Sequence, residues 1–593
     1  MCGIIGYVGQ NNNALHVLID GLKTLEYRGY DSSGVAYVKN KKIEIKKEKG
    51  KIIELEKILD LKTETNIGIA HTRWATHGQP NQINSHPHQI GSICIVHNGI
   101  IENYEEIKEL LVNEGYKFKS DTDTEIACGL IDYFYQTHQH IIKALKCFKG
   151  MVRGSYALGI IVDTKLDTIY AIRKDSPLII AHDKTGNYIA SDVPAILKYT
   201  NQYILLEENE IAVLSATSKK IYNDNEEEIV KETLTFEGSQ ESAMKNGYDH
   251  FMAKEINEQP GVINKIIHTH LLNNSKLINL SSYDKIDIIG CGSAYHAGLV
   301  GKHLIESYGN IPCNVEIASE YRYKKQFLTK NSLVIVISQS GETADTLACL
   351  RKVKEEGIQT LAIVNVVGSS IARLADKVIY TDAGIEIAVA TTKAYCAQVA
   401  LLSLLAFQLI NDKTLKENII NQFQKLPLLM ENLIKSKDYM EIAKNIYQSE
   451  NIFYLGRGID YPLIIEGSLK LKEISYIHSE AYSAGELKHG TISLVTQKTP
   501  IIALITEEHL AEKTISNIKE VKARGANVIV ITTEDLDKNG DYYDKKIVIP
   551  KTDCFTQGFL AMIPLQLIAY EIALLRNCDI DKPRNLAKSV TVE

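Results

Sequence analysis

The chain has 593 residues, of which 45% are hydrophobic and 23% charged, and its net charge is −7. One hydrophobic core stops growing at roughly 250 to 300 residues, so the chain must divide into domains; about 150 residues per domain suggests about four. The composition excludes disordered and fibrous proteins. The negative charge offers no overall attraction to nucleic acid or to an anionic membrane, so an anionic substrate would need a local site.

The sequence favours a cytoplasmic protein with no secretory signal and no membrane span. The N-terminus lacks a basic segment that leads into an apolar run. Residues 394–410 are the most apolar stretch that we identify, but polar residues interrupt them, and we expect a buried helix there. The ten cysteines include no CxxC pair and fit neither a disulfide framework nor a zinc ribbon, so we expect most of them to be buried.

The first 240 residues alternate short β-rich runs with turns. Strands are expected at residues 4–8, 34–38, 67–71, 93–97, 157–163, 168–173 and 211–214, and helices at 14–25 and 104–113. Because strands outnumber helices and tight turns join them, we expect packed antiparallel sheets with helices outside. In the lysine-rich run 39–51, aliphatic residues alternate with lysines and no aromatic residue interleaves, which favours a solvated hairpin over a nucleic-acid site.

Beyond a charged stretch at residues 223–232 and a helix that begins near residue 253, the pattern becomes strand, glycine-rich turn and helix, repeated. Two segments repeat each other at an offset of 166 to 168 residues. Expected strands at 286–289, 333–337, 361–364 and 376–379 correspond to 452–455, 501–505, 528–531 and 544–547. Each copy predicts a parallel sheet with helices on both faces. Residues 406–449 predict a helical connector that joins the two copies.

One loop of the first copy has the composition of a phosphate site. Ser338-Gln339-Ser340-Gly341-Glu342-Thr343 supplies three hydroxyls, a glycine, and the free N–H groups of the helix that follows. An ordinary helix N-cap is the alternative. The second copy has Thr506-Glu507-Glu508-His509 at the equivalent place, where two carboxylates would repel a phosphate. We therefore expect one phosphate site per pair of copies, and the absence of a P-loop lysine motif favours a phosphorylated small molecule over a nucleotide.

A helix in the second copy carries Glu466, Lys470 and Glu473 on one face, at positions i, i+4 and i+7. A salt-bridged stripe that faces solvent is the alternative. The segment after it is dense in titratable and small residues, which is typical of a site: Ser479-Glu480-Ala481-Tyr482-Ser483-Ala484-Gly485-Glu486-Leu487-Lys488-His489-Gly490. The closing residues 582–593 form a tail, which is disordered by default.

Cys2 is the one cysteine for which we expect chemistry. Removal of Met1 would place its thiol beside its own α-amine, which can act as the base for its own nucleophile. Arg73 could bind a carboxylate and Asp123 an ammonium, and the Asn98 amide with the Gly99 N–H could form an oxyanion hole. These groups suit an amino acid with a side-chain amide.

A metal site formed by His71, His77, His86 and His88 is the alternative for this region. We favour it less because the histidines show no helical i, i+4 spacing and no adjacent cysteine set. Trp74, the only tryptophan, could be a core anchor, but its Arg, Thr and Gly neighbours favour a mobile lid.

Along essentially its whole length the chain resembles the glutamine–fructose-6-phosphate aminotransferases (isomerizing), the glucosamine-6-phosphate synthases. The motifs that carry the resemblance are Cys2-Gly3-Ile4, Arg73-Trp74-Ala75-Thr76-His77, His97-Asn98-Gly99, the loop 338–343, the helix with Glu466 and Glu473, Glu486-Leu487-Lys488-His489-Gly490, and the closing residues from Arg584 to Glu593.

The resemblance implies an α+β N-terminal nucleophile (Ntn) glutaminase domain with packed antiparallel sheets, followed by two α/β sugar isomerase (SIS) domains with parallel sheets. On the present sequence we place the glutaminase domain at residues 2–218, a linker and helical lead-in at 219–275, and the first, phosphate-binding SIS domain at 276–415. A helical connector at 416–441, the second SIS domain at 442–583 and an active-site tail at 584–593 complete the chain. The short linker looks like the bacterial form and implies a homodimer through the SIS domains.

The family's reaction transfers ammonia from L-glutamine to D-fructose 6-phosphate and isomerises the product to D-glucosamine 6-phosphate, with release of L-glutamate, as the first step of amino-sugar (UDP-N-acetylglucosamine) synthesis. By resemblance, Cys2 attacks glutamine, Asn98 and Gly99 form the oxyanion hole, and ammonia passes inside the protein to the sugar, with Trp74 as the gate. The other residues that would bind glutamine are Arg73, Thr76, His77 and Asp123. No cofactor, metal, nucleic acid or membrane is implied.

For the sugar, the resemblance implies that Lys588 forms a Schiff base, Glu473 moves a proton between C1 and C2, and His489, donated by the neighbouring subunit, assists ring opening. The residues expected to contact the sugar phosphate are Ser293, Ser338, Gln339, Ser340, Thr343, Val389, Lys470 and Ala587. Two positions depart from the family pattern: Ala294, where a hydroxyl is usual, and the segment after His489, where bacterial relatives often have a proline.

Two other functions remain open at this stage. An amidotransferase that uses phosphoribosyl pyrophosphate would need a diphosphate loop rich in acidic residues, which we do not find. A non-catalytic phosphosugar sensor of the same fold would bind the sugar phosphate without turnover.

Overall fold

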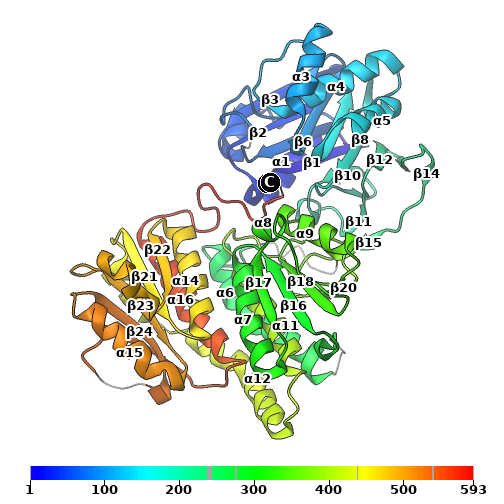
Figure 1. Cartoon of the computed structure of the whole chain (residues 1–593). Helices are drawn as coiled ribbons and strands as arrows, with labels where there is room; N and C mark the ends of the chain where they lie inside the picture. Colours follow the sequence, from blue (N-terminus) through cyan, green and yellow to red (C-terminus); the bar gives the residue numbers. More distant parts are fainter. Residues whose placement is uncertain are drawn as a thin grey trace. The chain divides into compact units, whose positions relative to one another are not determined.

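The computed structural model describes residues 2–75, 77–236, 244–273, 277–436, 438–536 and 540–591 (Figure 1). Their contacts group them into two compact units. The first unit holds the described residues up to 236, together with Glu342–Ala344 and the tail from Ala587. The second unit holds the rest of the described chain, including both copies of the repeat.

The first unit contains the following elements. Its strands are β1 (Gly3–Gly9), β2 (Ser32–Lys39), β3 (Lys42–Lys49), β4 (Ile67–Arg73), β5 (His88–Ile90), β6 (Ile93–Ile101), β7 (Gly154–Val162), β8 (Lys165–Lys174), β9 (Ile179–His182), β10 (Gly186–Ala190), β11 (Gln202–Leu205), β12 (Ile211–Ser215), β13 (Lys219–Tyr222), β14 (Glu228–Ile229) and β15 (Leu234–Thr235). Its helices are α1 (Ala14–Leu25), α2 (Ile52–Ile58), α3 (Tyr104–Asn113), α4 (Asp123–His138) and α5 (Ile141–Met151), with short turns η1 (Glu26–Arg28) and η2 (Val193–Ala195).

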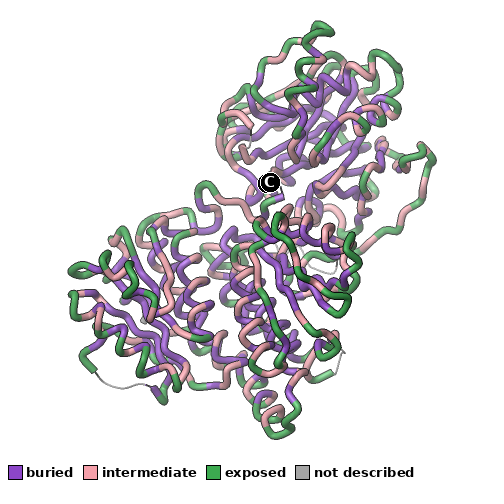
Figure 2. The backbone as a smooth tube through the Cα atoms, in the orientation of Figure 1, coloured by how far each residue is buried: buried purple, intermediate pink, exposed green. Residues whose placement is uncertain are grey.

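Two antiparallel sheets pack face to face in this unit. Within the described residues their strand orders are β15-β11-β9-β10-β1-β4-β2-β3 and β14-β13-β12-β8-β7-β6-β5. Ile4 and Ile69 of the first sheet share a buried cluster with Val96 and Ile161 of the second, and the strands are buried along much of their length (Figure 2). Helix α1 covers the outer face of the first sheet, and α4 with α5 covers the second. The expected sandwich of antiparallel sheets is confirmed.

The lysine-rich run is a hairpin, as expected. β2 and β3 pair from Ser32 with Lys49 to Lys39 with Lys42. The two turn residues, Asn40 and Lys41, have φ of 51° and 58°, which is typical of a two-residue hairpin turn. Lys42, Lys46 and Lys49 of β3 are exposed, whereas Lys47 turns inward and its Nζ donates to the Ser85 carbonyl oxygen at 2.7 Å.

Helices α4 and α5 are absent from the sequence expectation. The first ten residues of α4, polar ones among them, are all buried. A helix without a polar face lacks the periodic pattern by which an amphipathic helix is recognised.

The second unit contains the following elements. Its strands are β16 (Lys285–Gly290), β17 (Cys313–Ile317), β18 (Ser332–Ser338), β19 (Gln359–Val364), β20 (Lys377–Tyr380), β21 (Asn451–Gly456), β22 (His478–Ser483), β23 (Pro500–Ile505), β24 (Asn527–Thr533) and β25 (Lys545–Ile549). Its helices are α6 (Phe251–Ile266), α7 (Ser293–Gly309), α8 (Ala318–Tyr321), α9 (Ala344–Glu355), α10 (Ser370–Leu374), α11 (Lys393–Phe407), α12 (Lys413–Ile434), α13 (Asp438–Ile446), α14 (Asp460–Ser475), α15 (Glu508–Lys522) and α16 (Gln557–Leu575). Short helical turns are η4 (Ile267–Leu272), η5 (Leu280–Ser282), η6 (Glu486–His489), η7 (Thr491–Leu494) and η8 (Glu534–Leu536).

The repeat is confirmed as two parallel sheets with the same topology. Within the described residues the strand orders are β17-β16-β18-β19-β20 and β22-β21-β23-β24-β25. One continuous apolar core joins them, from Ile288 and Leu333 of the first sheet to Ile502 and Ile529 of the second. Helices α7 and α14 contact each other across this core. The two copies therefore form one compact unit, and the domain boundaries given above stay predictions.

Two features of this unit, and the burial of the cysteines in both units, differ from expectation. Residues 478–483 form the edge strand β22 instead of an irregular loop. The expectation that 394–410 would be the most apolar stretch is wrong, because α16 is longer and more apolar. In the described residues α16 alone is long and apolar enough to cross a membrane, yet 72% of its apolar window is buried inside the protein, as in a core helix. Five of the ten cysteines are buried and five half-buried.

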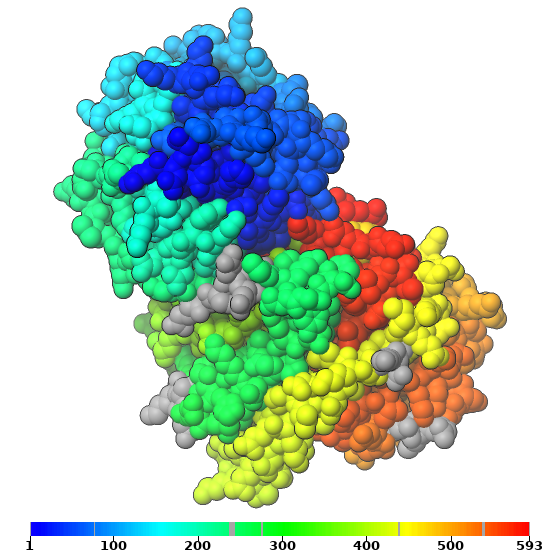
Figure 3. Space-filling model, turned by 180° about the vertical axis from the view of Figure 1, so that it is seen from behind, coloured from blue at the N-terminus to red at the C-terminus, as the bar shows by residue number. Residues whose placement is uncertain are grey.

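Helix α12 lies along the surface of the second unit, in yellow-green in Figure 3, and offers a matched pair for testing this packing. Phe423 is fully buried, whereas Leu428 on the same helix is 63% exposed. Replacing Phe423 with Ala should lower the free energy of unfolding by about 3–5 kcal/mol, because it leaves a cavity in the shared core. Leu428→Ala should change it by about 0.5 kcal/mol or less. Chemical denaturation measures both, and equal losses would contradict the packing described.

Candidate active site

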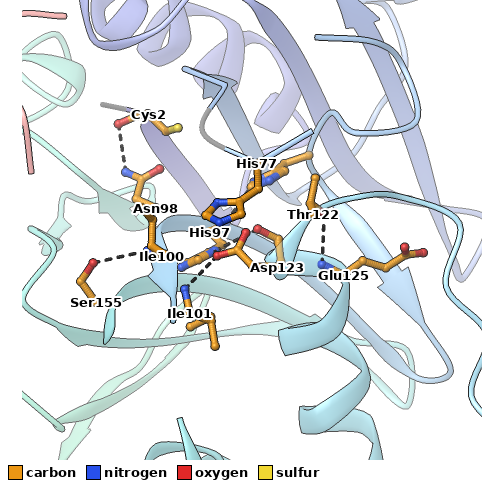
Figure 4. Close-up of polar contacts among 12 residues, drawn as sticks. Cys2, His77, His97, Asn98, Ile100, Ile101, Thr122, Asp123, Glu125 and Ser155 are labelled. Carbon is orange, nitrogen blue, oxygen red and sulfur yellow. Dashed lines mark hydrogen bonds and ion pairs between the residues drawn. The ribbon is translucent and has the colours of Figure 1, made fainter. Parts of the chain in front are cut away.

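Strand ends of the first unit bring the predicted nucleophile and its neighbours together. Cys2 immediately precedes β1, Arg73 ends β4 and Asn98 lies within β6. The pairing of Gly3 with Thr72 places Cys2 beside the end of β4. Figure 4 shows Cys2 and Asn98 close to His97, His77 and Asp123.

The backbone of Trp74 holds the thiol of Cys2. The Trp74 N–H donates to Cys2 Sγ at 3.2 Å, and the thiol can donate to the Trp74 carbonyl oxygen at 3.5 Å. Burial raises the pKa of the Cys2 thiol, although the Trp74 N–H and the Arg73 cation act in the opposite direction. The thiol is therefore protonated at neutral pH and needs a base before it can attack.

Asn98 is fixed from both sides. Its Nδ2 donates to the Cys2 carbonyl oxygen at 3.0 Å, and its Oδ1 lies 3.1 Å from His71 Nε2. Because an amide oxygen only accepts, His71 carries its proton on Nε2, and one N–H of Asn98 remains for another acceptor. Gly99 has φ of +127°, and a Cβ there would lie 2.1 Å from the Ser155 carbonyl oxygen, so the position requires glycine.

Four buried histidines lie behind Asn98: His71, His86, His88 and His97. The rings of His71 and His86 stack with centroids 4.1 Å apart. Burial lowers the pKa of all four, to about 3 for His71, so they are neutral. Among the described residues no group of three or more His, Cys, Asp or Glu side chains is placed to hold a metal ion. The histidines therefore form a neutral support for Asn98, and the metal alternative gains no support.

Arg73 and Asp123 are both buried and lie close enough to interact electrostatically. Arg73 is 3% exposed; its Nη2 donates to the carbonyl oxygens of His77 and Gly78, whereas its Nη1 is buried without a hydrogen-bond partner in the described part of the chain. Asp123 begins α4 and accepts the Ile101 N–H at 2.9 Å. A buried guanidinium nitrogen without an acceptor is costly, and a carboxylate ligand would match its planar geometry.

The loop after β4 contains the remaining predicted glutamine contacts. Trp74 is half-buried, with its ring edge-on to Tyr30, so it is not a core anchor. His77 packs edge-on against Tyr104, and Thr76 lies outside the described residues. Asp31, which accepts the Ala75 N–H at 2.9 Å, helps to hold this loop. No motif marks Asp31, because its role depends on the pairing of Ser32 with Arg73.

The predicted phosphate loop follows β18 and leads into α9. Gly341 has φ of +66°, and its N–H donates to Ser338 Oγ at 3.0 Å. The Ala344 N–H at the start of α9 donates to the carbonyl oxygen of Val590 at 3.0 Å. This helix N–H is therefore taken by the tail and is not free for a ligand, in contrast to the expectation. The tail itself is partly buried, with Lys588 half-buried two residues before Val590.

In the second copy, carboxylates of the chain occupy the corresponding loop. Glu507 accepts the Ile459 N–H at 2.8 Å, and the carboxylate of Asp460 accepts the N–H and hydroxyl of Thr506. Burial raises the pKa of Asp460 to about 7. The loop of the second copy is therefore held by carboxylates of the chain itself, and phosphate binding by the first copy stays a prediction.

The predicted carboxylates of α14 belong to a largely buried ion network, in which Glu473 keeps 19% of its side chain exposed. Glu466 and Lys470 are fully buried, and Lys470 Nζ lies 3.3 Å from Glu466 Oε1 and 2.6 Å from Glu473 Oε2. Lys470 Nζ also donates to Ser293 Oγ at 3.2 Å. The solvent-stripe alternative is therefore wrong. A fully buried Lys470 and an internally bonded Ser293 fit a supporting role behind Glu473 better than the direct sugar contact expected from sequence.

The remaining predicted sugar residues differ in burial. Val389 is buried, and its N–H donates to the Asp581 carbonyl oxygen. Ala587 is half-buried, and Ala294, on the first turn of α7, is buried and carries no hydroxyl. His489 is exposed and lines an open cavity of about 530 Å³ with Arg457 and Lys513.

The comparisons with known proteins agree with this architecture. A SIS domain matches residues 279–408 and 445–576, and a glutamine amidotransferase domain matches residues 71–198. The glutamine–fructose-6-phosphate aminotransferase (isomerizing) of Caldanaerobacter subterraneus subsp. tengcongensis is 48% identical over 611 residues, which cover 100% of both chains.

The chain belongs to the glutamine–fructose-6-phosphate aminotransferase (isomerizing) family. The family member of Bacillus subtilis is 43% identical, again over 100% of both chains. Among solved structures, the C-terminal domain of glucosamine-fructose-6-phosphate aminotransferase from Francisella tularensis is 36% identical with a TM-score of 0.55, and covers 57% of this chain and 99% of that one.

Gly341 offers a test of the phosphate loop. A Cβ there would lie 2.0 Å from Ser369 Oγ, in addition to the positive φ, so Gly341→Ala must move the loop. Because strain of ~1–3 kcal/mol accompanies such a conformation and 1.4 kcal/mol is tenfold in affinity, binding of fructose 6-phosphate should weaken about tenfold or more by calorimetry. Gly357→Ala is the matched control: its φ is +73°, but nothing lies within 4 Å. Equal affinities for the two variants would contradict the assignment of the loop.

Proposed function

We propose that the chain converts L-glutamine and D-fructose 6-phosphate into D-glucosamine 6-phosphate and L-glutamate, with the work divided between a glutaminase site and a phosphosugar site. The family's reaction needs a glutaminase site and a phosphosugar site. The observation that carries the proposal is that one chain holds both: a thiol beside an arginine whose Nη1 has no acceptor among the described residues, and, in one copy of the repeat, a hydroxyl-rich loop with a glycine at positive φ.

In the first unit, we propose that the Cys2 thiol attacks the side-chain amide carbon of glutamine. Its proton passes to its own α-amine after Met1 is removed and then to the leaving nitrogen, so that ammonia departs and a glutamyl thioester remains. Water then cleaves the thioester, releasing glutamate and the thiol. The free N–H of Asn98 and the Gly99 N–H stabilise the oxyanion.

Substrate binding in this unit follows from the charges of the pocket. Arg73 Nη1 takes the α-carboxylate of glutamine, which would satisfy its orphaned donor, and Asp123 takes the α-ammonium. Trp74, Thr76 and His77 belong to the loop that closes over the bound substrate and gates the passage of ammonia.

In the second half of the reaction, Ser338, Gln339, Ser340 and Thr343 hold the phosphate of fructose 6-phosphate. The Lys588 amine condenses with the C2 carbonyl of the open sugar, losing water, and ammonia then displaces the lysine to leave an imine at C2. Glu473 removes a proton from C1 and returns one to C2, which converts the imine into the 2-amino aldose. Val389, Ala587 and the exposed His489 of a neighbouring subunit complete the site, and His489 assists ring opening.

This proposal includes a homodimer formed through the two SIS domains, the domain boundaries given from sequence, and a cytoplasmic location. A turnover assay distinguishes this enzyme from a phosphosugar sensor of the same fold. A sensor would bind fructose 6-phosphate and form no glucosamine 6-phosphate. It would also be indifferent to Lys588→Ala.

Cys2→Ala tests the division of work. The variant should lose all glutamine-dependent formation of glucosamine 6-phosphate, because the thioester cannot form, while fructose 6-phosphate is still isomerised at the second site. Cys147→Ala, at another half-buried cysteine of the first unit, is the matched control and should behave as wild type. Persistence of glutamine-dependent product in Cys2→Ala would refute the assignment.

A further inference from the structure

His296 lies outside every residue set assigned so far, yet it contacts the buried ion network of α14. It lies on the first turn of α7, three residues after Ser293, so the two side chains share one helix face. Only 8% of His296 is exposed, and its Nδ1 lies 2.7 Å from Glu466 Oε2. Its helix belongs to the first copy of the repeat, whereas Glu466 belongs to the second.

Both oxygens of Glu466 are engaged from α7. His296 donates to Oε2, and Ser293 Oγ donates to Oε1 at 2.8 Å. A carboxylate is an acceptor only, so Nδ1 of His296 carries the proton of this bond. Glu466 is fully buried, so these two donors stabilise a charge that has no access to water.

The ammonium of Lys470 is shared unequally between two carboxylates. It lies 2.6 Å from Glu473 Oε2 but 3.3 Å from Glu466 Oε1. Hydrogen bonds from His296 and Ser293 already satisfy much of the charge of Glu466, which weakens its pull on Lys470. The ammonium therefore leans toward Glu473, the only member of the ion network whose side chain retains substantial exposure, 19%.

We infer that His296 is a positioning residue for sugar isomerisation: its hydrogen bond to Glu466 leaves Lys470 free to hold Glu473 in place. This inference rests on the proposed role of Glu473 as the group that moves the proton between C1 and C2. Without the imidazole donor, Oε2 of the buried Glu466 would lack a hydrogen-bond donor, and this carboxylate would draw Lys470 away from Glu473. The proton-transferring carboxylate would then lose both its orientation and its fixed cation.

Three variants separate this role from a merely structural one. His296→Leu removes the donor at similar volume. His296→Asn retains an N–H donor near the position of Nδ1. His303→Leu makes the same exchange farther along α7, where the side chain is half-buried.

The assay measures kcat and KM for fructose 6-phosphate in glutamine-dependent formation of glucosamine 6-phosphate, together with glutamine hydrolysis and Tm. For His296→Leu we expect kcat to fall about 10- to 100-fold, because a small displacement of a reacting group costs that much. KM should change by about twofold or less, since the phosphate contacts are untouched. Glutamine hydrolysis should equal that of wild type, His296→Asn should recover most of the lost kcat, and His303→Leu should match wild type.

Several outcomes would overturn the inference. A His296→Leu enzyme with wild-type kcat, or a His296→Asn enzyme as slow as His296→Leu, shows that the donor does not matter. Parallel losses of kcat, glutamine hydrolysis and Tm in His296→Leu show a structural role instead. Failure of the proposed function is distinguishable, because the wild-type enzyme would then form no glucosamine 6-phosphate or Glu473→Gln would keep full kcat.

Discussion

The ion network of the second unit depends on one fully buried ammonium group, that of Lys470, which two carboxylates must neutralise. Lys470 has no access to water, so its ammonium is stable only where Glu466 and Glu473 surround it. Glu466 in turn depends on Ser293 and His296 of α7, in the other copy of the repeat. The ion network therefore lies where the two copies join, and neither copy could hold it alone.

This dependence explains why a duplicated fold holds a single predicted site. At the repeat offset of 166 residues, Glu466 and Lys470 correspond to Val300 and Leu304, which are buried apolar residues of α7. The loop after the second strand of each copy diverges in the opposite direction: the first copy has Gly341 at positive φ, whereas carboxylates of Glu507 and Asp460 bind the loop of the second. The proposed function therefore draws its phosphate loop from one copy and its ion network from the other.

The first unit uses the same principle of buried polar groups, but leaves some of them unsatisfied. The neutral His71 donates to the oxygen of Asn98 and fixes its orientation. Arg73 Nη1, by contrast, is buried with no acceptor among the described residues. A buried donor without an acceptor destabilises the protein until a ligand supplies that acceptor. The Nη1 group of Arg73 therefore favours binding of a carboxylate.

Local pattern was sufficient for most strands and for the repeat, because period-two alternation and glycine-rich turns are short-range signals. It failed for α4, whose first turns are buried on all sides, and for β22, whose titratable residues resemble a loop. Single residues such as Cys2 and Gly341 were predictable from motifs, whereas His296 and Asp31 were not. Their roles depend on contacts with residues far away in sequence, at Glu466 and Ala75.

The stoichiometry of a single turnover assay shows whether glutamine hydrolysis and sugar amination are steps of one reaction. Glutamate and glucosamine 6-phosphate, counted together at saturating fructose 6-phosphate, should form in equal amounts. Glutamate formed with no matching amino sugar would show that the two sites are not coupled.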